Sequence, residues 1–138
     1  MCVDVEKLFD SFDPCKLIEI MVELEYPTLL LVITLQAHWA MRILAAASSA
    51  GPVVQVTRSV LAGCIQSVSF ARGYIYPVLH FMHTRLPAVP CDSWIDDIYG
   101  RCEGPRRKLV LHLVDAGHQL MSLLVGMGLT VSSKSVVM

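Results

Sequence analysis

Two long apolar stretches, 28–47 and 109–129, constrain the fold of this chain more than any other feature of its sequence. A membrane-spanning helix needs about 18 or more residues that are almost all apolar. The first stretch contains Gln36, His38 and Arg42, and an arginine near the middle of a span costs about 2.5–3.5 kcal/mol on insertion scales. The second contains two histidines, an aspartate and a glutamine. Both stretches therefore favour helices buried inside a larger fold, with a small helical membrane-associated protein as the competing interpretation.

The composition excludes several classes of protein. The chain has 138 residues, of which 54% are hydrophobic and 17% charged, so it is not intrinsically disordered and its length indicates one domain. Its net charge of -1 gives no global basic field for nucleic acid. The five cysteines include no CxxC pair, which predicts free thiols in an intracellular compartment, the cytoplasm or nucleus. Both ends of the chain are apolar, and we expect the sequence to be the interior of a longer protein.

Turn signals and apolar periodicity divide the chain into strands and helices. Asp13 and Pro14 predict a helix start, with aspartate as N-cap and proline at the first helical position. Residues 106–108 are predicted to form a basic turn before the last helix, and exposure to solvent is the simplest explanation of their charges. Pro77 predicts a kink or a break in the helix over 65–84. The expected strands are 2–5, 53–57 and 129–136, the expected hairpin is 93–99, and the expected helices are 15–24, 28–47, 65–84 and 109–125. This order predicts an α+β fold, a mixed or antiparallel sheet with helices packed on one face.

Apolar periodicity also predicts which sides of two helices are buried. In the first helix this side consists of Leu17, Ile20, Met21 and Leu24. In the last helix it consists of Leu109, Leu113, Ala116, Leu120, Leu123 and Leu124.

Three aspartates lie in apolar surroundings where an isolated charge is hard to hold. Asp96 and Asp97 stand between Trp-Ile and Ile-Tyr, and Asp4 interrupts an apolar strand. A polar hairpin tip is the simplest explanation of the adjacent pair, because burying two neighbouring carboxylates needs a compensating positive charge. Taken together, the three acids fit a site for two divalent metal ions, which clamp the attacking and leaving oxygens of a phosphoryl transfer. Magnesium needs only one or two protein carboxylates, together with water and substrate phosphates.

Four short motifs resemble those of reverse transcriptases of the non-LTR retroelement and group II intron type. Residues 4–10 (DVEKLFD) resemble the first catalytic motif, and residues 93–97 (SWIDD) resemble the aromatic-x-Asp-Asp box. Between them, residues 62–67 (AGCIQS) resemble a Gly-Cys-x-x-Ser motif, and residues 128–135 (GLTVSSKS) resemble a later Gly-Leu-x-x-Lys motif. The motifs stand in the family's order and cover nearly the whole chain. The resemblance implies that residues 1–138 are the partial palm domain of an RNA-directed DNA polymerase.

The resemblance also implies roles for individual residues. Asp4 and Asp96 would bind two Mg²⁺ or Mn²⁺ ions, and Asp97 would assist them. Lys134 would neutralise or protonate the leaving pyrophosphate during nucleotidyl transfer to a primer 3′-hydroxyl.

Two further positions would contact the nucleotide. Phe9 would exclude a 2′-hydroxyl, and Gly63 would allow the backbone to approach the nucleotide or template closely. A core aromatic and a helix-entry turn are the simpler structural explanations of these two residues. Leu8, Ala62 and Gln66 depart from the family, which usually has a small residue, a glutamine and a leucine at these positions.

The implied partners are an RNA template, a DNA primer and deoxynucleoside triphosphates, with no membrane. The parent protein would be a mobile-element polymerase whose fingers precede Asp4 and whose thumb follows Met138. We therefore expect the isolated chain to be inactive. Besides the membrane-associated alternative, a decayed palm kept as a non-catalytic interaction domain remains open.

Overall fold

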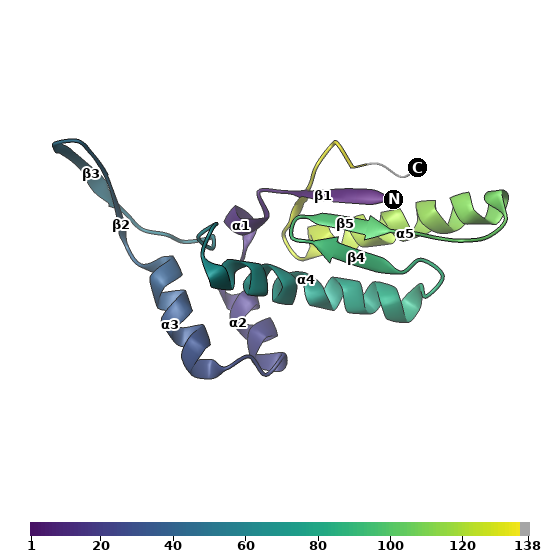
Figure 1. Cartoon of the computed structure of the whole chain (residues 1–138), viewed down its shortest axis with the longest axis horizontal. Helices are drawn as coiled ribbons and strands as arrows, with labels where there is room; N and C mark the ends of the chain where they lie inside the picture. The colour runs from purple at the N-terminus through teal and green to yellow at the C-terminus, as the bar shows by residue number, and fades with distance from the viewer. Residues whose placement is uncertain (136–138) are drawn as a thin grey trace.

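The structure is a computed structural model, and it describes residues 1–135 (Figure 1). The elements, in chain order, are β1 (Cys2–Glu6), α1 (Leu8–Ser11), α2 (Pro14–Glu23), α3 (Thr28–Trp39), β2 (Arg42–Ala46), β3 (Ser49–Val54), α4 (Ile65–Arg85), β4 (Cys91–Trp94), β5 (Asp97–Gly100), α5 (Arg106–Gly126) and β6 (Thr130–Val131). They form a four-stranded sheet of order β4-β5-β1-β6 and a separate hairpin, β2-β3. Each pairing in these two sheets is antiparallel. The α+β prediction with an antiparallel sheet is therefore confirmed.

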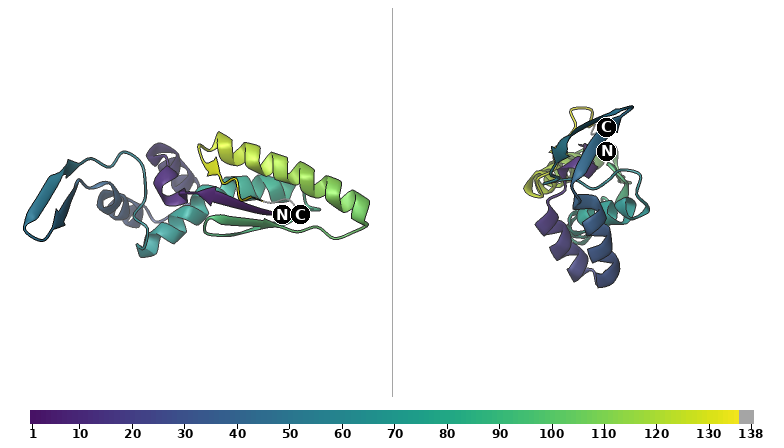
Figure 2. Two further views of the ribbon diagram at one scale, coloured as in Figure 1. Left: turned by 90° about the horizontal axis from the view of Figure 1, so that it is seen from above. Right: turned by 90° about the vertical axis from the view of Figure 1, so that its left-hand side faces the viewer.

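The four-stranded sheet has one covered face and one open face. Val3 and Val5 of β1 and Ile98 of β5 are buried, whereas the residues that alternate with them are not. Successive side chains of a strand point to opposite faces, so the buried set defines the covered face. The long helices α4 and α5 contact the sheet at β4 and β6, and Figures 1 and 2 show them packed beside it. The open face carries Asp4 and Asp97.

An aromatic cluster joins the helices beneath the sheet. Phe12, Phe70 and Tyr74 are fully buried, and the rings of Phe12 and Tyr74 lie 4.7 Å apart. The Tyr74 hydroxyl donates to the Met127 carbonyl at 3.1 Å and accepts the Asp13 N–H at 3.4 Å. One side chain of α4 therefore connects the start of α2 with the end of α5.

The predicted start of the first helix is confirmed. The Asp13 carboxylate accepts the N–H groups of Cys15 and Lys16 at 2.9 and 3.1 Å, and Pro14 is the first helical residue. The predicted buried side is right for Leu17, Ile20 and Met21 but wrong for Leu24, which is 39% exposed. Leu24 is the C-cap of α2, where the helix ends and its side chain leaves the packed face.

The predicted helix over 28–47 is wrong in its second half. The helix ends at Trp39, and Arg42–Ala46 is a strand paired with Ser49–Val54. Alanine-rich residues favour a helix locally, but cross-strand pairing with the β-branched Val53 and Val54 overrides that preference. The hairpin extends away from the rest of the protein (Figure 1), and Pro52 is tolerated because each strand of a two-stranded ribbon is an edge.

Three other predictions need smaller corrections. The strand predicted over 53–57 is β3 instead, which begins at Ser49 and ends at Val54. Pro77 does not break α4, which runs without interruption from Ile65 to Arg85. The basic residues 106–108 form the first turn of α5 rather than a turn before it. The predicted hairpin at 93–99 is confirmed and extends to Cys91 and Gly100, and the last strand is confirmed at Thr130–Val131. The expected continuation of that strand near Val136 lies outside the described residues.

Of the described helices, α5 alone is long and apolar enough to cross a membrane. All five cysteines are free thiols, as their spacing predicted.

Candidate functional site

The register of the sheet places two of the three predicted acids directly opposite each other. Asp4 of β1 is the cross-strand partner of Asp97 of β5. Met1 and Gly100 exchange both of their backbone hydrogen bonds, at 2.9 and 3.0 Å, and Val5 donates to the Asp96 carbonyl at 2.9 Å. Hydrogen-bonded and non-hydrogen-bonded pairs alternate along an antiparallel ladder, so Asp4 and Asp97 form a non-hydrogen-bonded pair. In such a pair the Cα atoms lie about 4.5 Å apart and the side chains are close on one face.

Asp96 occupies a different position, in the two-residue turn between β4 and β5. The Asp96 carbonyl accepts the hydrogen bond from the Val5 N–H, and Asp96 is exposed to solvent. The preceding residue, Ile95, has a φ of 56°, a left-handed conformation that is strained for a β-branched residue. The turn is therefore held in a costly conformation at the end of β1, beside the two facing carboxylates.

Aromatic side chains stand beside the acids on the open face. The Tyr99 hydroxyl donates to Asp97 Oδ2 at 3.1 Å. This hydrogen bond is the main cause that raises the pKa of Tyr99, because it favours the protonated phenol. Trp94 is the cross-strand partner of Asp97 on β4 and is 68% exposed. The open face therefore combines closely spaced carboxylates with exposed aromatic rings.

The segment that follows α5 lies along the other edge of β1. Ser132 donates its N–H to the Asp4 carbonyl at 2.8 Å, and Ser135 Oγ accepts the Asp4 N–H at 3.1 Å. The Lys134 N–H donates to Ser132 Oγ at 3.2 Å, and the Lys134 residue is exposed. The fold thus brings the last sequence motif beside the first. The sequence had not indicated Ser132 or Ser135, because short serine runs carry no pattern that distinguishes them from a surface loop.

Phe9 and Gly63 lie in neighbouring segments near the end of β1. The Phe9 carbonyl accepts the Val60 N–H at 2.7 Å, which joins α1 to the loop before α4. Phe9 is half-buried, with its ring edge-on to Phe12 at 6.2 Å. Gly63 is exposed at a φ of 87°, with open space where a Cβ would lie. The positive φ therefore explains why this position is a glycine, because a Cβ here would meet no other atom of the described chain. Leu8, where the family usually has a small residue, is buried in the core.

Within residues 1–135, no group of three or more His, Cys, Asp or Glu side chains is arranged to hold a metal ion. Asp4 and Asp97 supply two facing carboxylates instead, which is the number of protein ligands that Mg²⁺ commonly uses when substrate phosphates complete its shell. Two like charges directly opposite each other destabilise a sheet. A divalent cation between them would remove that repulsion, so this donor set fits the predicted ion.

A second polar feature, which the sequence did not single out, is the fully buried His38 of α3. Its Nδ1 accepts the Leu61 N–H at 2.8 Å, so its Nε2 carries the proton, and that atom has no partner within the described residues. Burial, and to a lesser extent Arg42, lowers the pKa of His38. The side chain therefore positions the loop before α4 as a neutral imidazole.

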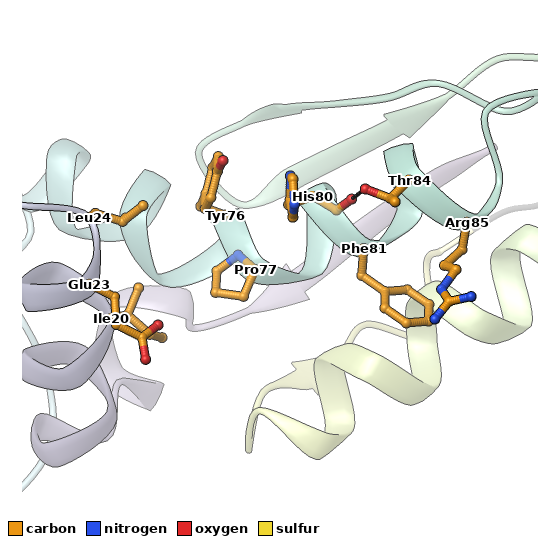
Figure 3. A pocket seen from close by; sticks show the side chains of 9 residues that line it. All are labelled: Ile20, Glu23, Leu24, Tyr76, Pro77, His80, Phe81, Thr84 and Arg85. Atoms are coloured by element: carbon orange, nitrogen blue, oxygen red, sulfur yellow. Dashed lines mark hydrogen bonds between the residues drawn. The ribbon is translucent and has the colours of Figure 1, made fainter.

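An open depression lies between α2 and α4, and its lining includes none of the three predicted acids (Figure 3). Its volume is about 550 Å³, and its lining residues are Ile20, Glu23, Leu24, Tyr76, Pro77, His80, Phe81, Thr84 and Arg85. The rings of Tyr76 and His80 are stacked, and Arg85 lies over Phe81. Most of these residues are exposed, and none belongs to the predicted site.

Comparison with known proteins does not assign the chain to a family. No model of a known protein family matches it, and no curated protein matches it in sequence.

Proposed function

We propose that this chain is the palm fragment of an RNA-directed DNA polymerase derived from a mobile element. The observation that carries the proposal is the facing pair of Asp4 and Asp97 beside the strained turn that contains Asp96. The segment of Lys134 on the other edge of β1 supports it, because three of the four motifs of the resemblance then lie on β1 or on the strands paired with it. The partners would be an RNA template, a DNA primer and a deoxynucleoside triphosphate, inside the cell.

The chemistry would be nucleotidyl transfer, in which a primer 3′-hydroxyl attacks the α-phosphorus and pyrophosphate leaves. Bound Mg²⁺ or Mn²⁺ would supply the positive charge that activates the hydroxyl and stabilises the leaving oxygens. Asp4 and Asp97 would hold the ions, and Lys134 would neutralise the pyrophosphate. Phe9 would contact the sugar and Gly63 the nucleotide or template.

The acidic face itself supports a role for cations. A polyanion such as a primer–template duplex is repelled by Asp4 and Asp97 unless positive charge intervenes. The geometry differs from the resemblance in one respect, because it favours Asp97 as the partner of Asp4, whereas the resemblance gives that role to Asp96. As an isolated chain the fragment would bind ions without extending a primer.

Manganese binding to the whole chain tests the proposal directly. Titration of Mn²⁺ followed by electron paramagnetic resonance would compare the wild type with Asp4→Asn and Asp97→Asn, and we expect each variant to bind at least about tenfold more weakly because one of two ligands is lost. Asp96→Asn measures whether the turn acid also contributes. Glu19→Gln, an exposed acid on α2, is the control and should bind like the wild type.

Two outcomes would count against a catalytic palm. Equal, negligible binding by the wild type and by Asp4→Asn would favour the decayed palm that serves as an interaction domain. Strong binding that none of the three aspartate variants weakens would place the cation elsewhere and remove the basis of the proposal.

A further inference from the structure

The outward side of α5 combines positive charge with exposed aliphatic side chains. Along one stripe of the helix, residues recur every three or four positions and most remain accessible to solvent. The apolar members, which we call the α5 stripe, are Val110 (50% exposed), Leu111 (67%), Val114 (40%) and Val125 (62%). Arg107 lies on the same side at the amino end, between Arg106 and Lys108, and all three are exposed. The helix therefore presents an amphipathic surface that the described part of the chain leaves uncovered.

The position of these three cations is unfavourable within the protein itself. They occupy the first turn of α5, which contains no acidic residue, and Pro105 provides no side-chain cap. The amino end of a helix carries partial positive charge, so cations there are destabilising. A local arrangement that lowers stability without a compensating contact is typical of a functional surface.

The opposite side of α5 is committed to the core. Leu113, Ala116, Leu120 and Leu124 are buried there. These contacts favour a helix that stays packed on the fold, although its length and hydropathy would allow it to cross a bilayer. In Figure 2, α5 forms an outer edge of the molecule, and about 27 Å of helix separates Arg107 from Val125. Such an edge can lie flat against a planar partner.

We propose that α5 docks the protein on the surface of an anionic lipid bilayer. The basic first turn would contact acidic headgroups, and the α5 stripe would enter the boundary between headgroups and acyl chains. A nucleic-acid backbone matches the cations but offers little to Val110, Leu111 and Val114, which continue the same surface. The docking surface shares no residue with the facing pair of Asp4 and Asp97, so it does not depend on the proposed polymerase function.

Vesicle flotation with the full chain tests this proposal. Vesicles of phosphatidylcholine with roughly 30% phosphatidylserine should bind the wild type, and binding should fall as salt is raised. Each cation at such a surface contributes about fivefold in affinity, so Arg106→Gln with Arg107→Gln should weaken binding about 25-fold. The matched control is Arg72→Gln with Arg85→Gln, two exposed arginines of α4, which should leave binding unchanged.

A second pair of variants separates lipid from other polyanions. Leu111→Gln with Val114→Gln changes exposed residues only, and circular dichroism would verify the fold. We expect this pair to weaken vesicle binding while keeping the salt dependence. The proposal is overturned if vesicles do not bind the wild type, or if the control pair weakens binding as much as the Arg106 and Arg107 pair. It is equally overturned if the Arg106 and Arg107 substitutions weaken binding to an RNA duplex but leave binding to vesicles unchanged.

Discussion

The Asp4→Asn variant should be more stable than the wild type in the absence of metal. It should be less stable than the wild type when a divalent cation is present. Asp4 and Asp97 face each other in a non-hydrogen-bonded pair and are both only partly exposed. At a separation of about 5 Å and with the full screening of water, their repulsion amounts to about 1 kcal/mol. The variant should therefore melt about 3–5 °C higher than the wild type in the presence of a chelator.

Magnesium should reverse this order. A cation that binds only the folded wild type at ten times its dissociation constant adds about 1.4 kcal/mol of stability, which exceeds the repulsion that asparagine removes. Differential scanning calorimetry with chelator and with Mg²⁺ would measure both states, and Glu19→Gln on α2 should show neither effect. High salt should shrink the chelator difference, because screening weakens the repulsion. An Asp4→Asn protein that melts at or below wild type in chelator would contradict the facing-acid geometry, and an unchanged order in Mg²⁺ would contradict the metal site.

Three further predictions concern the frame around the site. Asp13→Ala removes the cap that holds two N–H groups of α2 and should lower the free energy of unfolding by about 1 kcal/mol in urea titrations. Tyr74→Phe leaves the Met127 carbonyl without its donor and should lower it by about 1–2 kcal/mol in the same assay, whereas Tyr76→Phe, at an exposed position, should leave it unchanged. The pKa of His38 is lowered by burial, so the stability it contributes is present above about pH 6.5 and is lost as the pH falls. His38→Gln should therefore lose less stability than the wild type as the pH falls below about 6.5, and equal slopes would refute the buried neutral imidazole.

Sequence patterns succeeded where a few neighbouring residues determine the structure. Asp13 caps its helix through bonds to residues two and three positions later, so the signal lies within one turn. The hairpin around residues 95 and 96 has its strands on either side of a two-residue turn. The prediction of a helix over 28–47 was wrong because the secondary structure of residues 42–46 depends on their pairing with residues 49–54. Local helix propensity contains no information about that pairing.

The site required information that the sequence does not carry locally. The sequence pointed to Asp4, Asp96 and Asp97, but their arrangement depends on the register between strands more than 90 positions apart in the chain. Val3, Val5 and Ile98 are buried on one face, and a slip of one residue would turn these apolar side chains toward solvent. The core therefore determines which acid faces Asp4. The register that buries Val3 opposite Ile98 also sets Asp97 opposite Asp4 and leaves Asp96 in the turn, so a substitution that shifted this apolar pairing would dismantle the candidate site without touching a carboxylate.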